Sequence, residues 1–187
     1  MAMNATEKEH YENCLENGKE FQDYVVSMLI KHKGIAISSF SSLLFQYGVG
    51  EGYQGFEIKL DLPSTNTGNL LIETGERTSK SGSWVKSGIH RDDNTDFYIV
   101  GNYKFFYLFD VKVLRRMEEK EEYLCKKETD TGQFFLLEQS VIEQDPPYIW
   151  KIKCGNEGKE LMKRVASPQK KFKDKCKIEH INSGEDK

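Results

Sequence analysis

The sequence contains no long hydrophobic run and no closely spaced pair of cysteines. Its longest apolar stretch, residues 105–109, falls far short of the roughly 18 residues that a membrane-spanning helix requires. The four cysteines, Cys14, Cys125, Cys154 and Cys176, form no Cys-x-x-Cys pair, which argues against a structural zinc site. The first nine residues are polar and lack the apolar core of a signal peptide. We therefore expect an intracellular, cytoplasmic protein with reduced thiols and no membrane association.

Charge of one sign is not in large excess either. The chain has 27 Lys and Arg residues against 30 Asp and Glu residues, so it is not a globally basic DNA binder. Residues 159–177 nevertheless hold eight basic residues against two acidic ones, a local excess of six positive charges. We expect nucleic-acid contacts from four of them: Lys163, Arg164, Lys170 and Lys171. A solvated tail that keeps the protein soluble is the equally compatible alternative.

Length and composition predict one folded domain with a tail. The 187 residues include eleven Phe, nine Tyr and two Trp, which suffice for a hydrophobic core. We expect this domain over residues 1–155. Residues 156–187 are expected to form a basic, partly disordered C-terminal tail.

Hydrophobic periodicity predicts the elements of the N-terminal half. Apolar residues at three- and four-residue spacing predict a helix over residues 6–33 that ends near Gly34. A short strand is expected at residues 35–37. Residues 53–62 and 69–74 also have strand patterns, and the turn-rich stretch between them predicts a β-hairpin.

The C-terminal half alternates strands with one longer helix. The pattern predicts strands at residues 96–100, 104–109, 133–137 and 148–152, and a helix over residues 111–127. Residues 76–94 have little periodicity, with a short helix as an option over residues 83–89. This order predicts a mixed α/β (α+β) fold with a central mixed β-sheet flanked by helices.

Two acidic residues mark the ends of the two hairpin strands. Asp61 ends the first strand and Glu73 ends the second, so a tight hairpin would place them on one face at one end. Lys59 lies on the same strand face as Asp61. Two neighbouring carboxylates repel each other unless a cation lies between them, and Mg²⁺ prefers such oxygen ligands. The pattern therefore favours a metal site.

The order of these residues resembles the PD-(D/E)XK nuclease superfamily, with its restriction endonuclease-like and Holliday junction resolvase-like members. The resemblance covers roughly residues 15–115 and rests on three stretches: Gly-Lys-Glu-Phe-Gln-Asp at residues 18–23, Gly-Phe-Glu-Ile-Lys-Leu-Asp at 55–61, and Thr-Gly-Asn-Leu-Leu-Ile-Glu at 67–73. It implies a restriction endonuclease-like core and a DNA endonuclease that depends on Mg²⁺ or Mn²⁺. Glu20, Asp61 and Glu73 would bind the metal, and Lys59 would complete the catalytic set. A homodimer would serve to cut both strands of a duplex.

The sequence departs from the family pattern after Glu73. The family motif has a lysine two residues after this acidic residue, where this chain has Gly75. Lys59 is the candidate replacement. The departure keeps open a catalytically degenerate nuclease-fold protein that binds nucleic acid or a protein partner. A third alternative is an α+β adaptor that presents the helix of residues 111–127 to a partner.

Individual residues also have structural alternatives. Asp61 could cap the turn that follows it. Lys59 could be an ion-pair partner of Glu57 or Glu73, and Glu57 could be either a further metal ligand or only a partner of Lys59. Near Glu20, two other acidic residues of the same helix compete for its role: Glu16 and Asp23.

Overall fold

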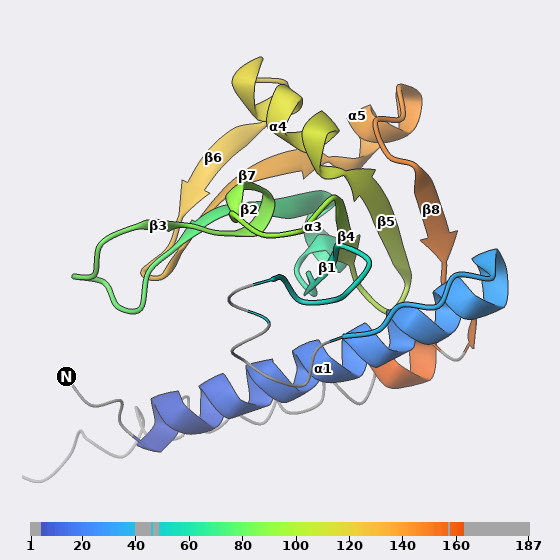
Figure 1. Ribbon diagram of the computed structural model, residues 1–187, viewed down its shortest axis with the longest axis horizontal. Coiled ribbons are helices and arrows are strands. Elements are labelled where there is room, and N and C mark those ends of the chain that lie inside the picture. Colours follow the sequence, from blue (N-terminus) through green and yellow to red (C-terminus); the bar gives the residue numbers. More distant parts are fainter. Residues whose placement is uncertain (1–4, 40–45, 47–48, 157, 163–187) are drawn as a thin grey trace, which may run out of the picture.

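The computed structural model describes residues 5–39, 46, 49–156 and 158–162, without the side chains of residues 5–8, 10 and 11. It confirms the expected mixed α/β class, with two four-stranded sheets and flanking helices (Figure 1). The first helix, α1 (Ala5–Lys33), runs unbroken through Gly18. It ends as expected at Gly34, which has φ +68° and whose amide donates to the Ile30 carbonyl at 3.0 Å.

The first sheet is mixed and has the strand order β1-β4-β5-β8. The edge strand β1 (Phe56–Leu60) pairs in parallel with β4 (Phe97–Gly101). The other pairs, β4 with β5 (Phe105–Asp110) and β5 with β8 (Trp150–Lys153), are antiparallel. This sheet contains the predicted strands of residues 96–100, 104–109 and 148–152.

The second sheet is antiparallel and has the order β3-β2-β7-β6. It contains β2 (Asn69–Glu76), β3 (Val85–Lys86), β6 (Cys125–Glu128) and β7 (Gly132–Glu138). Short helices connect the strands: α3 (Ser64–Thr67), the 3-10 helix η1 (Gly88–His90), α4 (Val111–Glu119) and α5 (Gln139–Gln144).

The first sheet is the middle layer of the molecule. One face packs against α1 in a cluster that includes Phe21, Leu29 and Ile99. The other face packs against the second sheet and α4, where Tyr107 and Phe135 are completely buried. Figure 1 shows α1 along one side of the molecule, with α4 and α5 on the opposite side. Because its central strands are covered on both faces, nearly all residues of β4 and β5 are buried.

The predicted hairpin of residues 53–74 is wrong. Both strands exist, but β1 joins the first sheet and β2 joins the second, with α3 between them. β1 pairs with β4, while β2 pairs with β7 over most of its length, so backbone pairing with distant strands replaces the local pairing. The period of two in β1 is nevertheless preserved: Ile58 packs on the α1 side, and Glu57 is buried without joining that apolar cluster.

Three smaller predictions also fail. Residues 35–37 form no strand. The helix predicted for residues 111–127 ends at Glu119, because Glu121 adopts a left-handed conformation (φ 57°) and the chain turns back into β6. Residues 83–89 contribute β3 and the start of η1 in place of one helix. Among the described residues, no helix has both the length and the apolar character needed to cross a membrane.

Candidate functional site

Lys59 connects two carboxylates that come from different sheets. Its Nζ lies 2.8 Å from Glu57 Oε1 and 3.1 Å from Glu73 Oε2. Glu57 and Lys59 are two residues apart on β1 and therefore project from one face, while Glu73 comes from β2. We refer to Glu57, Lys59 and Glu73 as the Lys59 cluster. It lies where the polar face of the edge strand β1 meets β2.

The electrostatics of the Lys59 cluster are set by burial and by mutual attraction. Glu57 is completely buried, and its Oε2 has no hydrogen-bond partner within the described part of the chain. Burial raises the pKa of Glu57, although the neighbouring Lys59 opposes this change. For Lys59, burial alone would lower the pKa, but Glu57 and then Glu73 raise it well above its ordinary value. The lysine is therefore held as an ammonium ion.

Residues 87 and 88 fix the position of Glu73. The Ser87 hydroxyl donates to Glu73 Oε1 at 2.8 Å, and the Glu73 amide donates to the Tyr98 hydroxyl at 3.3 Å. Gly88 packs so closely that an added Cβ would lie 2.2 Å from the Glu73 carbonyl oxygen. Its φ of +54° also favours glycine. The start of η1 therefore positions this carboxylate against Lys59.

Asp61 is buried in a separate hydrogen-bonded group. Its Oδ1 accepts from the Ser64 amide at 3.1 Å and its Oδ2 accepts from the Leu71 amide at 2.9 Å. Burial raises its pKa, while these two hydrogen bonds lower it. The sequence predicted Asp61 opposite Glu73, but the structure places Lys59 there. Asp61 instead binds an amide of β2 and the first turn of α3.

The remaining predicted site residues are not part of the Lys59 cluster or lie outside the described residues. Glu20 is exposed on α1, and it does not line the pocket that other residues of this helix form. Its role as a metal ligand stays a prediction, as does that of Asp61. The basic residues at positions 163, 164, 170 and 171 lie outside the described residues.

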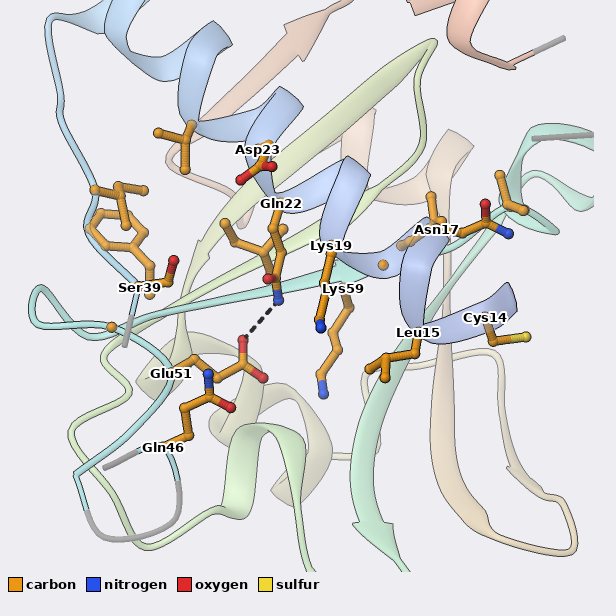
Figure 2. A pocket seen from close by; sticks show the side chains of 18 of the residues that line it. Cys14, Leu15, Asn17, Lys19, Gln22, Asp23, Ser39, Gln46, Glu51 and Lys59 are labelled. Atoms are coloured by element: carbon orange, nitrogen blue, oxygen red, sulfur yellow. Dashed lines mark hydrogen bonds between the residues drawn. The ribbon is translucent and has the colours of Figure 1, made fainter. Parts of the chain in front are cut away.

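A pocket of about 480 Å³ adjoins Lys59 (Figure 2). Its wall consists of one side of α1, the edge strand β1 and the segment that precedes β1. Figure 2 shows Lys59 and Glu51 entering this space, with Lys19 and Gln22 of α1 above them. Gln22 Nε2 donates to Glu51 Oε2 at 3.5 Å, and Arg91 Nη1 lies 3.7 Å from Glu51 Oε1. Charged groups thus face an otherwise largely apolar pocket.

The chemistry of the Lys59 cluster suits a hard cation. Mg²⁺ is commonly held by one or two carboxylates together with water and substrate oxygens. Glu57 and Glu73 supply two carboxylates that already converge on one positive charge. Among the described residues, no group of three or more His, Cys, Asp or Glu side chains is arranged to hold a metal ion. A metal at this cluster would therefore have two protein ligands, with Glu57 in the place that the sequence predicted for Asp61.

Comparisons with family models, with curated proteins and with solved structures found no match to this chain.

The sequence did not indicate that Ser87 and Tyr98 contact Glu73, and it gave Glu57 only a secondary role. Glu57 was considered only as an additional ligand or as a partner of Lys59, although Glu57-Ile58-Lys59 has the acidic-x-Lys spacing of a nuclease motif. That spacing was a usable signal. Ser87 and Tyr98 gave no such signal, because their contacts with Glu73 join residues 14 and 25 positions apart.

Proposed function

We propose that this protein is a divergent PD-(D/E)XK nuclease that hydrolyses DNA phosphodiester bonds at the Lys59 cluster, with Mg²⁺ or Mn²⁺ as its cofactor. The observation that carries the proposal is the convergence of Glu57 and Glu73 on the Lys59 amine. In this arrangement Glu57-x-Lys59 supplies the acidic-x-Lys motif, which lies one strand earlier in the chain than the sequence pattern indicated. The lysine missing at Gly75 is then not required.

A functional role also explains why Glu57 is buried. Moving a carboxylate into the protein interior is unfavourable unless its charge and lone pairs are compensated. Lys59 compensates one oxygen of Glu57, but the other has no hydrogen bond within the described residues. Buried ionisable groups with shifted pKa values are frequent at active sites. We infer that the unfavourable burial of Glu57 is retained because Glu57 binds a cation.

Each residue of the Lys59 cluster has a distinct role in this proposal. Glu57 and Glu73 hold the cation, and Ser87 fixes the orientation of Glu73. Lys59 remains protonated and donates hydrogen bonds to a phosphate oxygen as negative charge develops there. The bound cation would supply Lewis-acid stabilisation and a water molecule of lowered pKa.

DNA is the proposed partner, and the basic residues of segment 159–177 would contact its phosphates. The segment that precedes β1 lines the pocket beside Lys59, so it is also placed to contact the phosphate backbone of a DNA strand that enters the site. We further propose a homodimer, because cutting both strands of a duplex requires two sites. We also propose a cytoplasmic location, where the four cysteines of the sequence would be reduced.

A second candidate is a nuclease-fold protein that binds nucleic acid or a protein partner without cutting. The ion pairs of Lys59 favour it, because one ammonium contacts both carboxylates and balances one of their two negative charges without any metal. The two candidates differ in whether the Lys59 cluster binds a divalent cation.

A cleavage assay tests the proposed activity. Wild-type protein is incubated with supercoiled plasmid and with branched DNA, in the presence of Mg²⁺ or Mn²⁺. We expect cleavage that Glu57→Gln and Glu73→Gln each reduce by about 100-fold or more, since each removes a charged cation ligand. The control is Glu119→Gln, which removes an exposed carboxylate of α4 that does not line the pocket and should retain activity. If wild-type protein neither cuts DNA nor binds Mn²⁺, the proposed activity is excluded and a binding role is favoured.

A further inference from the structure

The following inference rests on the proposed function and concerns Lys59. Its ammonium group lies within 3.1 Å of a carboxylate oxygen from each of the two proposed ligands. A divalent cation bound by the same carboxylates would lie next to this ammonium and repel it strongly in a partly buried site. Lys59 and the cation therefore compete for Glu57 and Glu73. When the cation is bound, the ammonium needs another position.

The pocket beside β1 provides the space for this movement. Lys59 lines the pocket, and 30% of its side chain is exposed. A lysine side chain is long and flexible, so its ammonium can shift while its backbone stays in β1. The new position must also supply a negative partner, because the ammonium remains charged.

Glu51 is placed to be that partner. It lines the same pocket and its side chain is only 22% exposed, so its charge is less screened than that of the exposed Asp23 on α1. Its contacts with Gln22 and Arg91 are long, at 3.5 and 3.7 Å, and leave its oxygens able to accept another donor. The charge of Glu51 already adds to the effects of Glu57 and Glu73 on Lys59.

The backbone around Glu51 is fixed by contacts with residue 94. The Asn94 amide donates to the Val49 carbonyl at 2.9 Å, and its Nδ2 donates to the Gly52 carbonyl at 2.9 Å. Gly50 has φ +131°, and an added Cβ there would lie 1.9 Å from Asn94 Oδ1. The loop therefore presents Glu51 to the pocket in a defined position.

We infer that Glu51 is a positioning residue that receives the Lys59 ammonium when a divalent cation occupies Glu57 and Glu73. Lys59 then has two positions, one between the carboxylates and one beside Glu51. In the second position it lies in the pocket, farther from the cation, where it can donate to a phosphate oxygen of the substrate. Glu51 thus favours cation binding by acting through Lys59.

Mn²⁺ titration of the full chain tests this inference without measuring activity. The variants are Lys59→Met, Glu51→Gln and the double variant, with Glu119→Gln, at an exposed position of α4, as the control for a lost carboxylate. We expect Lys59→Met to bind Mn²⁺ more tightly than wild type, because a competing charge is removed. Glu51→Gln should weaken binding by about tenfold in wild type and have almost no effect when Lys59 is already Met. Glu119→Gln should bind like wild type.

Each alternative gives a different result. Equal weakening by Glu51→Gln in both backgrounds would mean that Glu51 acts on the ion directly, and would overturn the inference. The inference would also be overturned if Glu51→Gln binds Mn²⁺ with wild-type affinity while Glu57→Gln and Glu73→Gln lose binding. The proposed metal site would then be correct, but Glu51 would have no role in it. If wild type and Lys59→Met both fail to bind Mn²⁺, the proposed function and the inference both fail.

A second measurement remains useful if Lys59→Met does not fold. The side-chain NMR signals of Lys59 are followed in wild type and in Glu51→Gln during titration with Mg²⁺, which is diamagnetic. In wild type, we expect Mg²⁺ to shift the Lys59 signals to a new, well-resolved chemical shift. In Glu51→Gln, we expect the signals to stay at an average chemical shift, because the side chain samples several conformations. Glu51→Asp, which keeps the charge, should restore part of the wild-type response. Identical spectra for wild type and Glu51→Gln at saturating Mg²⁺ would contradict the inference.

Discussion

Asp61 and Glu73 have the same chemistry in the sequence but opposite surroundings in the structure. Glu73 accepts from side chains, Lys59 and Ser87, and those side chains can move or exchange partners. Both oxygens of Asp61 accept from backbone amides, one in α3 and one in β2. At Leu71, β2 pairs with β7 on one side, but β3 pairs only at Gly75 and Glu76, so the Asp61 carboxylate supplies the acceptor for the Leu71 amide. The residue thus joins the two sheets.

This difference predicts separate effects for substitutions of the two residues. Asp61→Ala leaves two amides of a buried region without acceptors, so we expect it to lower the free energy of unfolding by about 2 to 4 kcal/mol. Urea denaturation measures the change. Asp92→Ala, at an exposed position, should change stability by less than about 0.5 kcal/mol.

The Mn²⁺ affinity of folded Asp61→Ala separates a structural role from metal ligation. We expect it to stay close to that of wild type, whereas Glu73→Gln should lose binding. Loss of Mn²⁺ binding in Asp61→Ala with unchanged stability would restore Asp61 as a metal ligand, as the sequence pattern suggested.

At the scale of elements, the segment from β3 through η1 determines how the site is assembled. It positions Glu73 through Ser87, and it is anchored to α4 where Arg115 Nε donates to the Ile89 carbonyl at 2.5 Å. His90 Nε2 lies 2.5 Å from Glu118 Oε2, which adds a second contact with α4. The sequence of this region has little periodicity and predicted a loop. In the structure it connects the Lys59 cluster to the hydrophobic cluster between the two sheets and α4.

Two glycine substitutions test the importance of this segment. Gly88→Ala would place a Cβ 2.2 Å from the Glu73 carbonyl oxygen in a left-handed conformation, so we expect it to destabilise the fold by about 2 to 4 kcal/mol and weaken Mn²⁺ binding. Gly18→Ala on α1 meets no atom within 4 Å and should stabilise by up to about 1 kcal/mol. Thermal unfolding and Mn²⁺ titration measure both effects. If the two variants were equally stable, the fold would tolerate a side chain at position 88, and the close contact with Glu73 would not require glycine.

For the whole molecule, the distribution of charge matters more than its sum. The chain carries a net charge of -3, but residues 159–177 have a local excess of six positive charges. Within the domain, Lys59 is surrounded by carboxylates that would repel DNA unless a cation is bound. Nucleic-acid affinity is therefore expected to depend on the basic segment and on a divalent cation together.

The basic segment can be tested by its effect on salt dependence. Replacing Lys163, Arg164, Lys170 and Lys171 with Gln should lower DNA affinity and reduce the slope of log K against log salt by about 3 to 4. Mn²⁺ affinity should not change. A control variant removes four exposed lysines of the domain: Lys80, Lys104, Lys112 and Lys120. An equal loss of affinity in this control would mean that net charge alone controls binding and that the four basic residues have no special role.

Local patterns in the sequence were sufficient for the elements that depend on short-range physics. The periodicity of residues 6–33 and Gly34 specify the length and end of α1, and alternation in residues 53–62 specifies the two faces of β1. The aromatic strands β4 and β5 were equally evident, since nearly all of their residues are apolar. The common strand face of Glu57 and Lys59 was predicted correctly for the same reason.

Only the tertiary structure decided which of these polar residues meet. The hairpin prediction assumed that strands adjacent in sequence pair with each other. Instead β1 pairs with β4, which begins 37 residues after β1 ends, and β2 pairs with β7. Backbone hydrogen bonding and burial of two apolar faces are satisfied only by this long-range arrangement. It places Lys59 rather than Asp61 beside Glu73, and it brings Ser87 and Glu51 to the site. The sequence by itself determined the chemical groups, and the packing of the two sheets decided which of them form the site.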